Sequence, residues 1–289
     1  MLKKMAYLLR SNKSQSVVPL MTDIQVIFDK SASMLSFGNS TRDQLYNLVQ
    51  DQIKLAEENK QEINISIKGF NQQSIIYVDN KNVLSLKSTT KNDFGRWVRP
   101  DGMTRFNDTI IECTQEQEKR VNDYMENLPH VVRELSPKIN QLIYIITDGY
   151  NNVGNSTVED VHSVITEARK RGVICILLAA NRDATELAKE CGMDEKIAMT
   201  MGNDPHTTEI AMGFTNTMIR GISSGSSRQD TLEFTELQRN SSQPVNDYDF
   251  SMNFLERSVN QITEDDEYDS DEDTLPPPDF KMPEPLTRQ

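Results

Sequence analysis

Long apolar segments are missing from this sequence of 289 residues, and no run approaches the roughly 18 residues that a transmembrane helix needs. The first ten residues contain only one short apolar stretch, Met5–Leu9, which is too short for the core of a signal peptide. We therefore expect a cytoplasmic protein without a membrane partner. A Gly-Lys pair is also absent, which excludes a nucleotide-binding P-loop.

Cysteine and histidine are scarce, with three of each in the chain. The spacings of Cys113, Cys175 and Cys191 fit no zinc pattern, and an odd number of cysteines argues against a disulfide framework. The three histidines stand in unrelated contexts. We expect reduced thiols and no histidine-based metal site.

Positive charge is in deficit, because 31 basic residues stand against 44 acidic ones and the net charge is -13. Residues 246–289 hold 13 of the acidic and 3 of the basic residues, so the rest of the chain is nearly balanced. A nucleic-acid-binding protein normally carries a basic surface. We therefore expect no nucleic-acid partner.

Short apolar strands alternate with helical patterns through the middle of the sequence. Strand patterns lie at 24–28, 63–67, 74–78, 142–146, 173–180 and 196–201, and helical patterns at 41–60, 106–127, 158–171, 183–190 and 207–222. This alternation predicts an α/β fold with a Rossmann-like, doubly wound, mostly parallel sheet and helices on both faces. The hairpin at 63–78 adds one antiparallel edge strand.

Three parts are expected along the chain. Residues 1–20 form an N-terminal arm, and residues 21–222 form the folded domain. Residues 223–289 begin with a Ser-rich linker and continue as a disordered tail that is acidic and rich in proline.

Oxygen-bearing side chains follow the predicted strands at three places. Asp29, Ser31 and Ser33 come directly after the first strand, and Asp148 follows the strand at 142–146. Thr104 lies in the loop before the helix at 106–127. Because the carboxyl ends of parallel strands meet at one edge of a sheet, these residues are expected to lie together in the crevice there.

The chemistry of these five residues suits a divalent cation. Carboxylates supply charge and hydroxyls supply neutral oxygens, which are the ligands that Mg²⁺ prefers in octahedral order. Residues 31 and 33 alternate, so an extended turn directs both hydroxyls the same way. We predict Mg²⁺, with Mn²⁺ or Ca²⁺ as alternatives, and one coordination position left for a ligand from another protein.

The pattern D-x-S-x-S, then a threonine, then an aspartate after a later strand resembles a von Willebrand factor A (VWA) domain with an intact metal-ion-dependent adhesion site (MIDAS). Segments 147–152 and 179–184 resemble stand-alone intracellular VWA proteins of bacteria and large DNA viruses. The sequence departs mildly at Ala32, where the family often has glycine, and at Met103, where a second glycine is common.

This resemblance implies a role for each ligand. Asp29 anchors the array, Ser31 and Ser33 coordinate directly, Thr104 coordinates when a ligand is bound, and Asp148 binds directly or through water. A protein partner then donates a Glu or Asp to the open position. The implied function is a metal-dependent protein–protein interaction module, not an enzyme.

Three alternatives stay open. The Asp, Ser and Thr side chains also suit helix caps without any metal. The site could instead only stabilise a structural or virion component. A metal-assisted phosphohydrolase is the third alternative, although Ser31 stands where a second aspartate would be needed as acid–base partner.

Two further features allow more than one interpretation. Trp97 lies between Arg96 and Arg99 and suits either a packing anchor or a rim contact near Thr104. The acidic tail suits a solvated segment, an internal competitor whose carboxylates enter the metal site of the same or another copy, or a binding segment for a basic partner.

Overall fold

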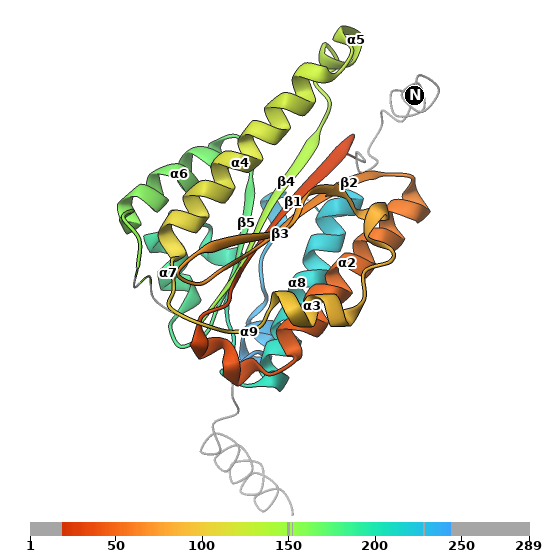
Figure 1. Cartoon of the computed structure of the whole chain (residues 1–289). Helices are drawn as coiled ribbons and strands as arrows, with labels where there is room; N and C mark the ends of the chain where they lie inside the picture. The colour runs from red at the N-terminus through yellow and green to blue at the C-terminus, as the bar shows by residue number, and fades with distance from the viewer. Residues whose placement is uncertain (1–18, 149–150, 152, 228, 244–289) are drawn as a thin grey trace, which may run out of the picture. The chain divides into compact units, whose positions relative to one another are not determined.

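Six strands form one sheet between two layers of helices in the computed structural model, which describes residues 19–148, 151, 153–227 and 229–243 (Figure 1). The strands are β1 (Met21–Asp29), β2 (Glu62–Phe70), β3 (Ser74–Asn82), β4 (Ile139–Thr147), β5 (Ile174–Ala179) and β6 (Ala198–Thr200). Their order is β3-β2-β1-β4-β5-β6, and every neighbouring pair is parallel except β2 and β3. The predicted doubly wound sheet with one antiparallel edge strand is confirmed.

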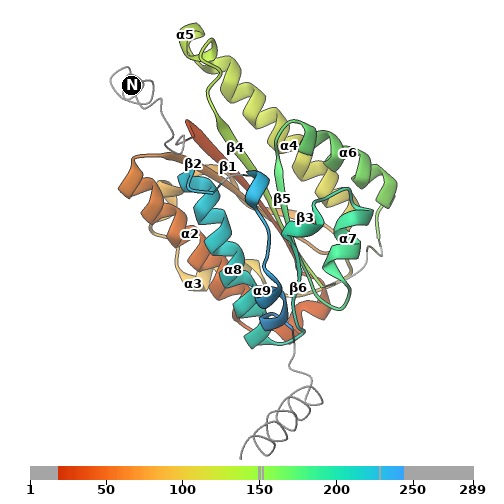
Figure 2. The same cartoon turned by 180° about the vertical axis from the view of Figure 1, so that it is seen from behind.

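Helices cover both faces of the sheet, as predicted (Figures 1 and 2). One face packs α2 (Ser40–Asn59), α3 (Lys91–Trp97) and α8 (Pro205–Ser224), and the other packs α4 (Phe106–Asn127), α6 (Val158–Lys170) and α7 (Ala184–Glu190). The remaining helices are η1 (Ala32–Phe37), η2 (Val83–Leu86), α5 (His130–Arg133), η3 (Glu195–Ile197), η4 (Gln229–Thr231) and α9 (Glu236–Ser241). Within the described residues, no helix is long and apolar enough to cross a membrane.

The central strand β1 explains where a site can form. Ile24, Val26 and Phe28 point into one core, and Ile27 points into the other, as the period of two in a strand requires. The strand order reverses at β1, which has β2 on one side and β4 on the other. The crevice at the carboxyl ends of such a switch point is the usual ligand site of an open α/β sheet.

A buried polar network joins β1 to α4 at the other end of the sheet. Asp23 is 2% exposed, and its Oδ1 accepts hydrogen bonds from Gln117 Nε2 at 2.9 Å and from the Arg120 guanidinium at 3.1 Å. The same guanidinium donates to Gln25 Oε1 at 3.0 Å. Removing one member of such a pair leaves an uncompensated charge in the interior.

Substituting Arg120→Met should therefore lower the free energy of unfolding by about 3 kcal/mol, because Asp23 stays buried without its cation. Urea unfolding followed by circular dichroism measures the change. The control is Lys119→Met on the same helix, whose exposed pair with Asp123 should be worth less than about 0.5 kcal/mol. Equal stability of the two variants would contradict the prediction.

The packed body continues beyond the boundary predicted at residue 222. Helix α8 runs to Ser224, and the chain then returns to the sheet, where Leu232 and Phe234 are buried. The Phe234 amide donates to Lys196 O at 2.9 Å, and Ser242 Oγ donates to Thr200 O at 2.8 Å. Residues 223–243 therefore include part of the folded unit and not only a linker. The predicted acidic tail and most of the N-terminal arm lie outside the described residues.

Candidate metal site

Asp29 ends β1, and its carboxylate holds the loop that follows. Its Oδ1 accepts the amide N–H of Ser31 at 2.7 Å. Its Oδ2 accepts the hydroxyl of Thr147, the last residue of β4, at 2.9 Å. One carboxylate therefore joins the carboxyl ends of the two central strands, and it is only 2% exposed.

Three further side-chain oxygens converge beside it. Ser31 Oγ and Ser33 Oγ lie 3.0 Å apart, so the alternating spacing directs both hydroxyls to one side. Ser33 Oγ donates to Asp148 Oδ1 at 3.0 Å, and Ser31 Oγ lies 3.4 Å from the same oxygen. The structure thus brings together Asp29, Ser31, Ser33 and Asp148 from the ends of β1 and β4.

Thr104 is placed next to this cluster by backbone contacts of its loop. The Ala32 amide donates to Gly102 O at 3.1 Å, and the Asp101 amide donates to Lys30 O at 2.6 Å. The Thr104 side chain is 3% exposed in this loop. Hence the loop that carries Thr104 is hydrogen-bonded directly to the loop that carries Ser31 and Ser33.

Helix capping does not account for these side chains. Ser31 occupies the N-cap position of η1 but makes no side-chain capping hydrogen bond. The N-cap of α4 is Arg105, one residue after Thr104. The hydroxyls of Ser31 and Ser33 instead face Asp148, so the cluster needs another explanation.

The arrangement fits a divalent cation. Adjacent oxygens around an octahedral ion with bonds of about 2.0–2.1 Å are about 2.9 Å apart, whereas the bonds of Ca²⁺ would give about 3.4 Å. The distances of 3.0 Å from Ser33 Oγ to Ser31 Oγ and to Asp148 Oδ1, and of 3.4 Å from Ser31 Oγ to Asp148 Oδ1, span this range, so the cluster has the spacing of ligands around a hard divalent cation. Asp148 Oδ2 is buried and has no hydrogen-bond partner within the described part of the chain. A bound cation would satisfy this oxygen.

The donor set is rich in hydroxyls and poor in charge. The described residues contain no group of three or more His, Cys, Asp or Glu side chains that could hold a metal. Only two carboxylates, Asp29 and Asp148, contribute here. A hard cation that accepts neutral oxygens suits this set, and a thiolate-bound or imidazole-bound metal does not.

Burial makes both carboxylates unfavourable as free anions. It raises the pKa of Asp29 to about 6, although hydrogen bonds from Ser31 and Thr147 offset part of the rise and the nearby Asp148 charge adds to it. Burial also raises the pKa of Asp148, against hydrogen bonds from Ser33 and Ser31. Two buried carboxylates that repel each other are the electrostatic setting in which a cation binds favourably.

Sequence reasoning did not single out two residues that position the site. Thr147 donates its hydroxyl to Asp29, and its signals in the sequence are its place beside Asp148 and the resemblance of segment 147–152 to VWA proteins. Asn181 adopts φ 60°, a left-handed conformation that asparagine tolerates, and its Nδ2 donates to Asp148 O at 3.2 Å. Only the pairing of β4 with β5 brings Asn181 to this place.

The loop after Asp148 is held against the start of α4. The Asp108 carboxylate accepts the amides of Asn155 at 3.2 Å and Ser156 at 2.8 Å, and the guanidinium of Arg105 at 3.0 Å. Burial opposes the charge on Asp108, but these hydrogen bonds and the cation outweigh it, so its pKa is lowered. Gly154 has φ 119°, and a Cβ there would lie 2.7 Å from Asp108 Oδ2.

Substituting Gly154→Ala should lower the free energy of unfolding by about 1–3 kcal/mol, because the new methyl group strains the backbone and pushes Asp108 away. The matched control is Gly172→Ala, where φ is also positive, at 92°, but no atom lies within 4 Å of the new Cβ. Chemical unfolding of both variants measures their free energies of unfolding. The loss in Gly172→Ala gives the cost of backbone strain alone, and the additional loss in Gly154→Ala gives the cost of the close contact with Asp108. A smaller loss for Gly154→Ala than for Gly172→Ala would contradict the prediction.

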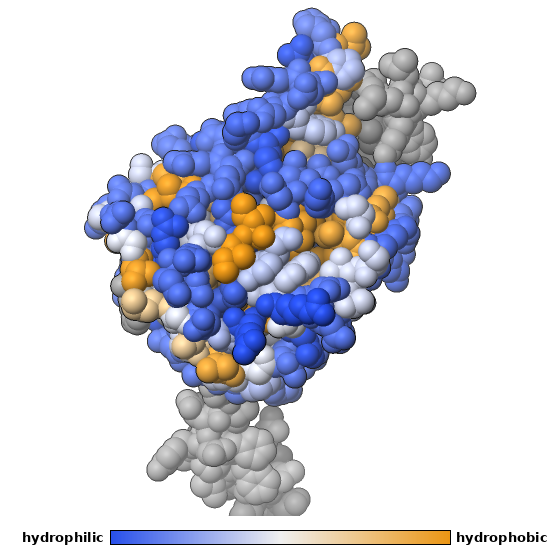
Figure 3. Space-filling model, in the orientation of Figure 1, coloured by the Kyte–Doolittle hydropathy of each residue, from blue (hydrophilic) through white to orange (hydrophobic). Residues whose placement is uncertain are grey.

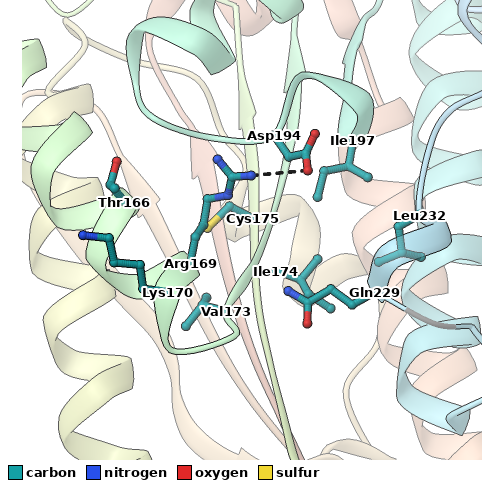
Figure 4. A pocket seen from close by; sticks show the side chains of 10 residues that line it. All are labelled: Thr166, Arg169, Lys170, Val173, Ile174, Cys175, Asp194, Ile197, Gln229 and Leu232. Carbon is teal, nitrogen blue, oxygen red and sulfur yellow. Dashed lines mark hydrogen bonds and ion pairs between the residues drawn. The ribbon is translucent and has the colours of Figure 1, made fainter.

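A pocket of about 310 Å³ lies at the amino end of β5, away from the candidate metal ligands (Figure 4). Ile174 and Cys175 line it from β5, and Arg169 reaches across it to Asp194, with a distance of 3.3 Å between guanidinium nitrogen and carboxylate oxygen. None of the five predicted metal ligands lines this pocket. It is therefore separate from the candidate metal site.

Fold and site together define the class of this domain. A doubly wound sheet carries D-x-S-x-S after its central strand, and an aspartate from the next strand of the sheet meets these serines. The fold is thus VWA-like, in agreement with the sequence resemblance.

No family model and no curated protein matches the chain. Among solved structures, the pilus adhesin SpaC from Lactobacillus rhamnosus GG, in an open conformation, is similar at 13% identity and a TM-score of 0.51 over 73% of this chain and 31% of that chain. Proximal thread matrix protein 1 from the mussel byssus, with a zinc-occupied MIDAS motif, is 16% identical, with a TM-score of 0.45 over 70% of this chain and 46% of that one. A von Willebrand factor type A structure from Catenulispora acidiphila is 13% identical, with a TM-score of 0.44 over 70% of this chain and 43% of that one.

These likenesses concern the fold alone. The chain spans less than half the length of each of these three solved chains. Of these three, the likeness to SpaC has a TM-score above 0.5. The resemblance to stand-alone intracellular VWA proteins of bacteria and viruses stays a prediction.

Proposed function

We propose that this chain is a metal-dependent protein-interaction module that holds Mg²⁺ and receives a partner's carboxylate. The observation that carries the proposal is the buried Asp148 Oδ2, which lacks a hydrogen-bond partner within the described residues while Asp148 Oδ1 faces two serine hydroxyls. A group that satisfies an anionic oxygen in this hydroxyl-lined cluster is a hard cation.

Each ligand residue has a distinct part in the proposal. Ser31, Ser33 and Asp148 hold the ion with their converging oxygens. Asp29 contributes charge and orients the loop, because both its oxygens already accept protein hydrogen bonds. Thr104 supplies a further hydroxyl from the adjoining loop. When bound, the ion supplies positive charge that neutralises the buried carboxylates and attracts a carboxylate from outside.

Exposed apolar side chains flank the site and suit a protein partner. Leu35 in η1 is 68% exposed, and Met103, the neighbour of Thr104, is 52% exposed. Each belongs to one of the two loops that carry the hydroxyl ligands. A partner that places a carboxylate on the metal would also bury these side chains, and such apolar contacts around a polar centre are typical of protein interfaces.

We propose no enzymatic activity for this site. Burial raises the pKa of Cys113, Cys175 and Cys191 to about 12, so these thiols remain protonated and do not act as nucleophiles at neutral pH. Asp29, the one carboxylate placed like a phosphatase nucleophile, has Ser31 at the position of the acid–base partner. Absence of Mg²⁺-dependent phosphatase turnover is the expected result of a substrate screen.

Calorimetric titration of the full chain with Mg²⁺ tests the proposal. We expect saturable binding that is at least tenfold weaker in the double variant Ser31→Ala/Ser33→Ala, because two coordinating oxygens are removed. Ser85→Ala, an exposed serine far along the chain on η2, is the matched control and should leave the affinity unchanged. Unchanged binding in the double variant would overturn the assignment.

The same samples distinguish an interaction site from a merely structural one. The probe is a fluorescent peptide, Gly-Gly-Asp-Gly-Gly, blocked at both ends so that it carries one carboxylate. Binding that requires Mg²⁺ and disappears with EDTA supports the interaction module. Metal that raises the melting temperature without any carboxylate binding would favour the alternative in which the site only stabilises the fold.

A further inference from the structure

A polar pocket of about 630 Å³, different from the one at β5, adjoins the loops of the candidate metal site. Three cations line it, Lys30, Arg96 and Arg99, and Asp101 is the one acidic residue among its lining residues. Lys30 lies between Asp29 and Ser31 in sequence, and Asp101 begins the loop that carries Thr104. The pocket and the metal site therefore share both of their loops.

Lys30 is buried without an ion pair. It is 7% exposed, and within the described residues its ammonium contacts no carboxylate and lies 5.5 Å from the centre of the Tyr77 ring. Lys68 is similarly buried, with 4% of its surface exposed, but it forms an ion pair. Its Nζ lies 2.8 and 2.9 Å from the two carboxylate oxygens of Glu116. A buried lysine is normally paired, so Lys30 lacks the anion that Lys68 has.

Gly69 leaves the space that the Lys30 side chain occupies. A Cβ at Gly69 would lie 2.7 Å from Lys30 Cδ, so the lysine stem passes over a position where only glycine leaves space. The Lys30 amide donates to Phe70 O at 2.6 Å, which fixes the backbone from which the stem begins. The ammonium is thus held at the pocket, and it does not extend freely into solvent.

Arg96 belongs to α3, and Arg99 follows two residues after the end of this helix. Trp97 stacks on Tyr77 with 5.6 Å between ring centres and contacts Phe94 at 4.5 Å, so the packing interpretation of Trp97 accounts for its position. This stack anchors α3, and the surface over α3 is strongly hydrophilic (Figure 3). Arg96 has only a distant pair with Asp93 at 3.7 Å, and Arg99 has no ion pair with any described residue.

We infer that this pocket binds a second carboxylate of the same partner segment whose first carboxylate reaches the metal. The ligand is an acidic peptide with two Asp or Glu residues a few positions apart. The inference rests on the proposed function, because the metal fixes the first carboxylate. An excess of two positive charges and a buried, unpaired ammonium select an anion, and guanidinium groups bind carboxylates in paired hydrogen bonds.

Peptide binding to the full chain in Mg²⁺ tests the inference. The probes are the blocked peptide Gly-Gly-Asp-Gly-Gly and a blocked series in which one Glu replaces the glycine one or two positions before or after the Asp. We expect at least one peptide with two acids to bind about tenfold more tightly than the peptide with one. The double variant Lys30→Met/Arg99→Gln should lose this advantage and keep its affinity for Mg²⁺ and for the one-acid peptide.

The control for general charge is Lys54→Met/Arg133→Gln, which removes two exposed cations from other parts of the surface and should keep the tenfold advantage. An advantage that survives in Lys30→Met/Arg99→Gln, or that never appears in the unmodified chain, overturns the inference. Tighter binding when phosphoserine replaces the second acid would also overturn it and reassign the pocket to phosphate.

Failure of the proposed function has a different signature. If the two-acid advantage depends on Lys30 and Arg99 but persists in EDTA, the pocket is supported and the metal role is wrong. If the one-acid peptide binds only with Mg²⁺ and the second acid adds nothing, the metal role is supported and the pocket is wrong. If no peptide binds, both are overturned.

Discussion

Replacing Asp148 with asparagine should weaken Mg²⁺ binding at least 100-fold while the fold survives. The substitution removes one of two carboxylate charges and turns one of the side-chain oxygens into an N–H donor, which repels a cation. The Asp148 side chain is 2% exposed, and its Oδ2 has no partner among the described residues, so no protein hydrogen bond is lost with that atom. A 100-fold loss corresponds to about 2.7 kcal/mol of binding free energy.

Calorimetry with Mg²⁺ measures this effect, and thermal unfolding without metal checks the fold. Asp101→Asn is the matched control, because it removes one carboxylate from the loop before Thr104 without touching the cluster of Ser31, Ser33 and Asp148. Its Mg²⁺ affinity should stay within about threefold of the unmodified chain, because a charge outside the first ligands acts through screened solvent. Similar losses in both variants would mean that general charge, and not coordination by Asp148, holds the ion.

Replacing Asp29 with asparagine should make the metal-free protein more stable at neutral pH. The folded-state pKa of Asp29 is about 6, above its ordinary value of 3.8, so ionisation opposes folding. The contribution of Asp29 to the free energy of unfolding is then most favourable below about pH 4 and declines as the pH rises to about 6. A difference of about two pKa units corresponds to about 3 kcal/mol at pH 7, and the asparagine variant avoids this cost.

Saturating Mg²⁺ should reverse the order of the two proteins. Metal that binds only the folded state adds about 4.1 kcal/mol at a concentration 1,000 times the dissociation constant, which exceeds the cost of about 3 kcal/mol, and the variant lacks this gain. Urea unfolding at pH 4, 5, 6 and 7, with EDTA or with Mg²⁺, gives the full comparison. Without metal, a stability advantage of the variant over the unmodified chain that does not grow from pH 4 to 7 would contradict the prediction.

Much of the sheet was predictable because its strands are short apolar runs. The patterns at 24–28, 142–146 and 173–180 fall on β1, β4 and β5, and the helical pattern at 106–127 coincides with α4. Burial on both faces makes such strands almost wholly apolar, which is a local signal. The five candidate ligands could be named for the same reason, since each follows or adjoins a predicted element.

The parts that were missed depend on contacts distant in sequence. Helix α3 has only seven residues, and its formation depends on a capping box between Thr90 and Asp93 and on the stack of Trp97 against Tyr77. The serine-rich chain after 222 predicts a linker, yet Phe234 is buried, and its amide donates to Lys196 O beside β6. The unpaired state of Lys30 cannot be seen in sequence at all, because it is defined by what surrounds the ammonium.

The central position of β1 also restricts the motion of the backbone from which the candidate site begins. β1 is paired with β2 along all nine of its residues and with β4 along eight of them, and all nine are buried. Amide protons of such a strand exchange with solvent only when the whole domain opens. Asp29 is the last residue of that strand, so the carboxylate at the base of the site is attached to an extensively paired and buried part of the sheet. A ligand would therefore meet, in Asp29, a carboxylate whose backbone is already ordered by the fold.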